Sequence, residues 1–261
     1  MKKRLSKDLL HKIEVLSLIT FLVHIGILIS RSKGATTPLT WQYVARNPLQ
    51  GRSSFAYRTF AEIPIIYSVM AVVILFFLLM LFKLRVYRKA VQADNKSEMS
   101  RFRWYELGLG GSFLAVLATQ LGGGYNPAIH IAILSAGIIF ATTGSRIEVA
   151  QKNGTAITKQ QKAHLLLSKL IILIFMIQQV VATFINNTAA NALVYQIAGV
   201  AAGFWLLQSI LIIMSFRKPR VSKKTKKPRS KASFVQYAVM HRLVSLAAVA
   251  AATWLVLTAV S

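Results

Sequence analysis

A few ionisable side chains fall inside long apolar stretches of the chain, where each is a candidate for chemistry. Glu106 is the most informative, with Arg103 one turn before it and Arg242 in a much later stretch. A carboxylate inside a bilayer must be neutral or have a cationic partner. Glu106 and Arg242 both lie about two turns from the same membrane side, so their depths match. We therefore expect an ion pair from Glu106 to Arg103 or Arg242, which is a structural role and needs no catalysis.

The other ionisable residues in apolar stretches point to less specific roles. His24 lies deep in its stretch, which favours a hydrogen-bonded core histidine over a proton carrier. His130 is near an outer end, where a wet interfacial histidine is favoured. Lys169 is within two turns of the cytoplasmic end and can extend its amine to the interface. His241 precedes Arg242 directly.

Several kinds of active site are excluded by residue content. The chain has no cysteine, so it has no disulfide, thiolate nucleophile or cysteine zinc site. It has no H-E-x-x-H motif, no phosphate-binding loop, no two carboxylates at helical spacing and no histidine pair at i,i+4. With only 7 Asp and Glu, we expect no catalytic residues, no metal site and no enzyme activity.

The composition is that of an integral membrane protein. Of 261 residues, 55% are hydrophobic and only 15% charged, and the mean hydropathy is +0.53. A soluble domain has about 25% charged residues. Seven apolar runs are each about 20 residues long, enough to span a bilayer. They predict an all-α protein with one seven-helix transmembrane domain over 1–261, with helices near 13–30, 63–82, 98–121, 127–144, 164–185, 192–216 and 233–258.

The basic residues predict the orientation. The formal net charge is +25, yet the Lys and Arg residues lie between apolar runs. Twenty-four fall on the side of the N-terminus and five on the other, all in the first loop. By the positive-inside rule, the N-terminus is cytoplasmic and the C-terminus extracellular, in the cell membrane. This role for the charge is favoured over nucleic-acid binding.

Two loops have residue patterns that the orientation of the chain does not explain. The cytoplasmic loop 217–232 holds nine Lys and Arg residues between Arg217 and Lys231. This density suits anionic lipid or an acidic cytoplasmic partner, although a solvated loop is favoured. The first extracellular loop, 31–62, has aromatic and β-branched residues on both sides of Asn47–Gly51, which predicts a small β-hairpin. Small residues in the third helix (Gly108, Gly111, Ser112) predict close packing within the bundle.

The chain resembles the heliorhodopsins, relatives of microbial rhodopsins with inverted orientation. The resemblance rests on the topology, on Arg103-Trp104-Tyr105-Glu106 opening helix three, and on the segment from Ser245 to Trp254 in helix seven. That segment is similar to the family's Ser-Leu-x-Ala-Lys followed by Trp, and His24 is similar to a family histidine. The resemblance implies a rhodopsin-like bundle, a retinal-binding lysine in helix seven and a homodimer.

The departure from the family lies at the lysine. Counting from Ser245, the retinal lysine falls on Val249, and helix seven contains no lysine. A Schiff base needs a primary amine, so covalent retinal is not expected. The family's glutamate at Glu106 is the counterion of that Schiff base. We hypothesise that Arg242, two turns before Val249, supplies the missing charge in cis.

The space of the absent chromophore has three alternatives. It is filled by side chains, holds a noncovalent retinoid, carotenoid or lipid, or is wet. Filling is slightly favoured, because aromatic residues at helical spacing are more often core. By resemblance, the lining would come from Trp104, Trp205, Gln208 and Trp254.

Three function classes follow. The favoured one is a non-pumping regulator or sensor of the membrane, related to a photoreceptor family. A transporter or channel is disfavoured because the outer half of the bundle offers no carboxylate. An intramembrane enzyme has the least support.

Overall fold

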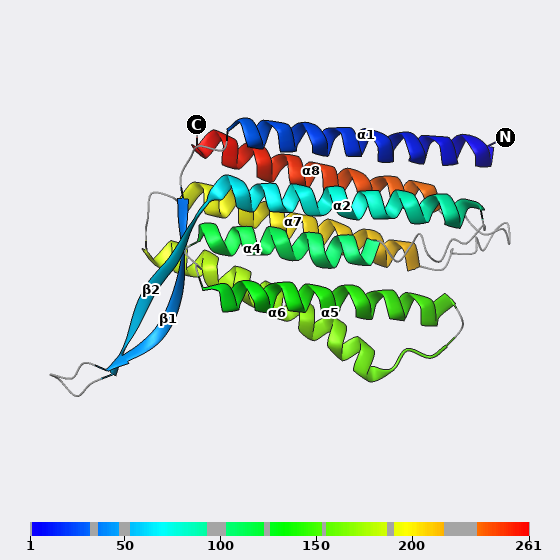
Figure 1. The fold of residues 1–261 in the computed structure, drawn as a ribbon. Coiled ribbons are helices and arrows are strands. Elements are labelled where there is room, and N and C mark those ends of the chain that lie inside the picture. Colours follow the sequence, from blue (N-terminus) through cyan, green and yellow to red (C-terminus); the bar gives the residue numbers. More distant parts are fainter. Residues whose placement is uncertain are drawn as a thin grey trace.

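Helices make up most of the computed structural model, which describes residues 2–31, 36–46, 53–92, 103–122, 126–152, 155–186, 191–216 and 234–260. They run side by side, with a two-stranded ribbon across one end of the bundle (Figure 1). The helices are α1 (Lys2–Ser30), α2 (Ile65–Gln92), η1 (Glu106–Gly110), α4 (Gly111–Leu121), α5 (Pro127–Lys152), α6 (Lys159–Asn186), α7 (Asn191–Phe216) and α8 (Phe234–Val260).

Six of these helices are long and apolar enough to cross a membrane. The other predicted span consists of a helical turn at 103–105, the π-helix η1 and α4. The backbone stays in the right-handed helical region at Tyr105, Gly110 and Gly111, so these pieces form one continuous helix over 103–121. The prediction of an all-helical membrane bundle is confirmed.

Several helices extend further than the apolar runs predicted. α1 begins at Lys2 rather than near 13, α2 continues to Gln92, and α5 continues to Lys152. Hydropathy marks only the stretch that suits lipid, whereas a helix can continue through charged residues with good helical propensity. The predicted starts at 98 and 233 and the basic loop 217–232 lie outside the described residues.

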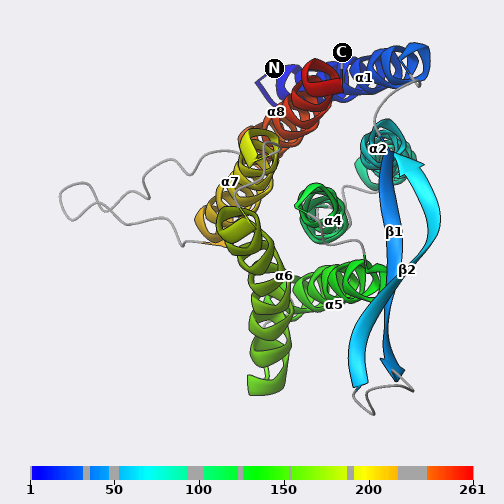
Figure 2. The ribbon, with the colours of Figure 1, turned by 90° about the vertical axis from the view of Figure 1, so that its left-hand side faces the viewer.

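The ribbon consists of β1 (Thr36–Arg46) and β2 (Ser53–Pro64), which pair antiparallel from Thr36 with Pro64 to Arg46 with Ser53. The register shifts between Leu39 and Thr40, where β2 has one extra residue. The ribbon crosses the end of the bundle from α2 past α5 (Figure 2). The predicted turn at Asn47–Gly51 lies outside the described residues.

The helix of η1 and α4 lies in the middle of the bundle (Figure 2), and most of its side chains are buried. Its glycines permit close contact. A Cβ on Gly108 would lie 2.5 Å from the Gly137 carbonyl oxygen of α5, and one on Gly111 would lie 2.6 Å from the Trp205 ring of α7. Close packing within the bundle is therefore confirmed for these glycines. The outer faces carry exposed Leu and Ile, as a lipid-facing surface requires.

Candidate functional site

The centre of the candidate site is an ion pair between Arg242 and Glu106. Arg242 of α8 is 1% exposed, and its Nη1 donates to Glu106 Oε1 of η1 at 2.9 Å. The expected match in depth between the two residues therefore holds. Of the two cations considered from the sequence, Arg242 makes this pair.

The ion pair continues into a chain of four charges, which we call the ion-pair chain: Lys83, Glu14, Arg242 and Glu106. Arg242 Nε donates to Glu14 Oε2 of α1 at 3.1 Å, and Lys83 Nζ of α2 lies 2.7 Å from Glu14 Oε1. Both carboxylates and Arg242 are almost fully buried, and the Lys83 side chain is 12% exposed. Two acids and two bases balance formally, so these four residues leave no unpaired charge among themselves. The chain connects α1, α2, η1 and α8.

Glu106 is the first residue of the π-helix η1. A π turn contains about one residue more than an α turn, which rotates the residues that follow onto a different face. Gly108 and Gly110 occupy the crowded side of η1. A Cβ on Gly110 would collide with the Phe76 ring of α2. The glycines thus allow the wide turn to sit against α2 and α5.

A second buried carboxylate, Glu148 of α5, is bound by the residues just before η1. Arg103 Nη2 lies 3.0 Å from Glu148 Oε2, and Trp104 Nε1 donates to the same oxygen at 2.7 Å. Trp104 also packs against Phe140, with ring centroids 5.6 Å apart. Arg103 therefore pairs with Glu148, and the indole of Trp104 has a polar function in addition to a packing one.

A third, uncharged cluster joins α7 to α8. Gln208 Nε2 donates to the His241 carbonyl oxygen at 2.9 Å and to Ser245 Oγ at 3.0 Å, and Gln208 Oε1 contacts His241 Nδ1. Ser245 Oγ also donates to the His241 carbonyl oxygen at 3.0 Å. Gln208 is thus fixed against the segment of α8 that contains Arg242 and Ser245.

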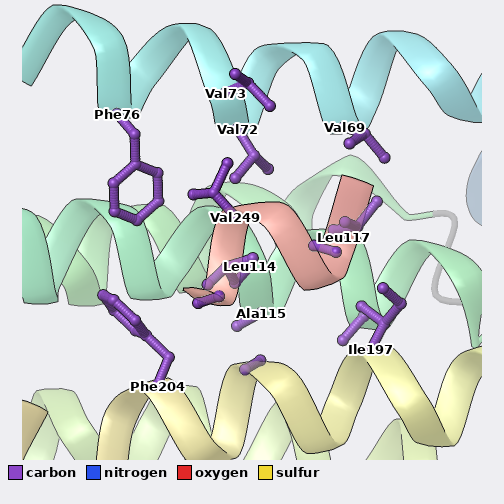
Figure 3. Packing of buried hydrophobic residues seen from close by; sticks show 14 of the residues in the cluster. Val69, Val72, Val73, Phe76, Leu114, Ala115, Leu117, Ile197, Phe204 and Val249 are labelled. Carbon is purple, nitrogen blue, oxygen red and sulfur yellow. The ribbon is translucent and has the colours of Figure 1, made fainter. Parts of the chain in front are cut away.

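Val249 lies in the apolar core, on the same face of α8 as Arg242 and Ser245. It is 1% exposed and sits between Val72 and Val73 of α2 and Leu114 of α4, with the Phe204 ring to one side (Figure 3). The residues around it belong to one continuous apolar cluster. None of the residues labelled in the figure offers a polar partner for a charged side chain at 249.

Comparison with known families decides the class of protein. The family profile described as Heliorhodopsin matches residues 10–260, nearly the whole chain. The chain belongs to the heliorhodopsin family. It is accordingly a rhodopsin-like, multi-pass membrane protein, as its apolar helices also indicate. A search of curated proteins found no match.

Of the other predicted site residues of this heliorhodopsin, Trp205 and His24 are buried and Trp254 is exposed. Trp205 is buried, and its ring packs edge-on against Phe140 at 5.0 Å. Trp254 was expected to line an internal pocket, but it is 51% exposed on the outer face of α8 and contacts His24 edge-on at 6.5 Å. The prediction for Trp254 is wrong, because residue 254 lies on the face of α8 opposite the buried Ala252 and Val256. His24 is buried, and its Nδ1 donates to the Thr20 carbonyl oxygen at 2.7 Å.

Sequence reasoning missed three residues: Glu14, Lys83 and Glu148. Glu14 lies just inside the first predicted run, and Glu148 lies just beyond the predicted end of the fourth. Lys83 was counted only as an orientation signal. The scarcity of acidic residues was the available clue, since with 7 in the chain each one near an apolar run required a partner. Within the described residues, no group of three His, Cys, Asp or Glu could hold a metal ion.

Proposed function

We propose that this heliorhodopsin-family protein is a non-pumping, non-enzymatic membrane regulator or sensor that does not attach retinal covalently. The observation that carries the proposal is the pairing of Glu106 with Arg242, at 2.9 Å, in a helix that has no lysine. In this proposal Val249 occupies the position of the family's retinal lysine, and Glu106 is the former counterion.

The residues present do not fit a covalently bound retinal. An imine needs a primary amine, and residues 234–260 contain none. Val249 is sealed among branched and aromatic side chains, which supports the alternative that the core is filled at this point. Glu106 already has a cation, so a second positive charge beside it would be uncompensated.

Adding retinal to the purified protein tests the proposal. We expect no visible band from an imine, and no mass increase after borohydride reduction, in wild type and in Lys169→Arg alike. Lys169 is the useful control because this half-buried lysine lines an apolar cavity between the helices. A reduced adduct in wild type that is lost in Lys169→Arg would overturn the proposal. A band that hydroxylamine does not remove would instead indicate noncovalent capture.

The arrangement of charges supports a protein that does not transport protons. Among the described residues, three acidic side chains are buried in the helical bundle: Glu14, Glu106 and Glu148. Each has a cationic partner. All three lie toward the end of the bundle where α1 begins. A proton path needs titratable groups distributed across the bilayer. A pH-sensitive dye in liposomes should report no proton flux above that of empty liposomes; a sustained flux would favour the transporter alternative.

The regulatory part of the proposal rests on the basic segment 217–231. We propose that it faces the cytoplasm and binds an acidic partner. Neutralising its nine basic residues should remove specific partners from a pull-down. An unchanged set of partners would contradict this role. A homodimer, which the resemblance implies, is part of the same proposal.

A further inference from the structure

A cavity opens beside α6, away from the ion-pair chain. It has a volume of about 240 Å³, and its walls come from the start of the third helix, from α5, α6 and α7. The Lys159 end of α6 leans away from α7 in both views of the bundle (Figures 1 and 2). The cavity lies where these helices diverge, so it is open to the surroundings of the bundle.

The walls are mostly apolar. Trp104, Leu107 and Phe140 form the inner wall, and Leu165 and Leu166 form the α6 side. Trp104 is held in place by its hydrogen bond to Glu148, and Phe140 by its ring contacts to Trp104 and Trp205. An apolar wall of fixed shape, open toward lipid, suits a hydrocarbon chain better than a polar solute.

Two lysines interrupt this apolar lining. Lys162 and Lys169 both line the cavity, seven residues apart on one face of α6, and Lys169 Nζ donates to Ser209 Oγ at 3.3 Å. Both lie in the stretch Lys159–Gln178 that is apolar enough to cross a membrane. Among the described residues, no carboxylate forms an ion pair with either amine. Lys162 is exposed and Lys169 half-buried, so both amines can reach an anionic headgroup at the edge of the bundle.

We propose that this cavity is a binding site for an anionic phospholipid of the surrounding bilayer. The acyl chain lies against Trp104, Leu107 and Phe140, and the phosphate accepts hydrogen bonds from Lys162 and Lys169. A phospholipid is the occupant because it supplies both an anion and a hydrocarbon chain from the side on which the cavity opens. The proposal is independent of whether the protein binds retinal or a cytoplasmic partner.

The test is phospholipid binding to the full chain in zwitterionic phosphatidylcholine nanodiscs. Phosphatidylglycerol is titrated in, and retained lipid is counted by native mass spectrometry. The matched variants each remove two basic residues: Lys162→Gln with Lys169→Gln at the cavity, and Arg146→Gln with Lys159→Gln at exposed positions that do not line it. The basic loop is present in both, so its attraction for lipid cancels.

Wild type should retain phosphatidylglycerol in preference to phosphatidylcholine, and the cavity variant should bind it about 30-fold more weakly, at about 1 kcal/mol for each basic residue. The control variant should stay within about threefold of wild type. Equal losses in both variants, or no loss in the cavity variant, would overturn the proposal. Competition at equal strength by inorganic phosphate alone, or by uncharged methyl oleate, would also overturn it, since the first lacks the hydrocarbon chain and the second lacks the anion.

A second measurement needs no substitution and covers the case in which the cavity variant does not fold. Phosphatidylglycerol brominated on its acyl chain should quench tryptophan fluorescence more than brominated phosphatidylcholine does, because Trp104 lines the site. Trp254, exposed on the outer face, is quenched equally by both lipids. Equal total quenching by the two lipids would contradict the site.

Discussion

Arg242 is the largest fully buried side chain among the described residues, and its guanidinium is shared between Glu14 and Glu106. A planar fork with five donors can bind two carboxylates at once, which an ammonium group does less well. Burying such a group is costly, and only close partners offset the cost. Arg242 thus links α8 to α1 and η1 through charge, and it does so on the helix where the resemblance places the family's lysine.

Glu148 offers a test at the scale of one residue. Glu148→Gln should lower the free energy of unfolding by about 1–3 kcal/mol, because Arg103 loses its anion and Trp104 Nε1 loses a charged acceptor. Glu62→Gln on the exposed part of β2 is the control; interactions of an exposed carboxylate contribute little, so the expected change is within about 1 kcal/mol. Both can be measured by thermal or denaturant unfolding in detergent. A loss at Glu148 no larger than that at Glu62 would mean that the buried contacts contribute little.

At the scale of elements, the third helix is the axis around which the others pack. Its glycines face ring systems and backbone rather than open space, so α2, α5 and α7 approach it closely. The π-helix falls in this crowded segment and carries Glu106 at its start. The same short stretch therefore contains both the closest helix contacts and the central carboxylate.

Gly111→Ala should destabilise the bundle by about 1–3 kcal/mol, because the new Cβ would meet the Trp205 ring at 2.6 Å. Gly203→Ala on α7 is a matched control, since a Cβ there meets nothing within 4 Å. The control should be neutral or stabilising by up to about 1 kcal/mol, as alanine suits a helix better than glycine. Equal effects of the two substitutions on the unfolding midpoint would contradict tight packing at Gly111.

The sequence allowed prediction of the apolar helices, because an uninterrupted apolar run of about 20 residues matches the thickness of a bilayer. It also indicated the pairing of Glu106, because a buried carboxylate at that depth needs a cation. The choice of Arg242 over Arg103 could not be made from spacing, since Arg103 is the nearer in sequence and its engagement with Glu148 depends on how α5 packs. The outward position of Trp254 likewise depends on the rotation of α8, and the apolar residues of that helix are distributed around all its sides.

At the scale of the whole molecule, charge is sorted between interior and loops. The chain has 32 basic and 7 acidic residues, and three of the acidic residues form buried ion pairs. The remaining basic residues lie mostly outside the apolar stretches. This sorting underlies the proposed orientation, with the N-terminus and segment 217–231 in the cytoplasm.

Cysteine labelling tests that orientation without background, because the chain has no cysteine of its own. Ser53→Cys, at the start of β2, should react with a membrane-impermeant maleimide on intact cells. Ser222→Cys, in the basic segment, should react only after the cells are permeabilised. The reverse pattern would show that the positive-inside rule fails for this chain.

The central claim is that Arg242 neutralises Glu106 inside the bundle, and a double-mutant cycle measures it most directly. Arg242→Leu alone should cost about 3–5 kcal/mol of unfolding free energy, because Glu106 and Glu14 lose a buried partner. With Glu106→Gln added, we expect the total loss to fall short of the sum of the two single losses by at least about 1 kcal/mol. Losses that add to within about 0.5 kcal/mol would contradict the claim.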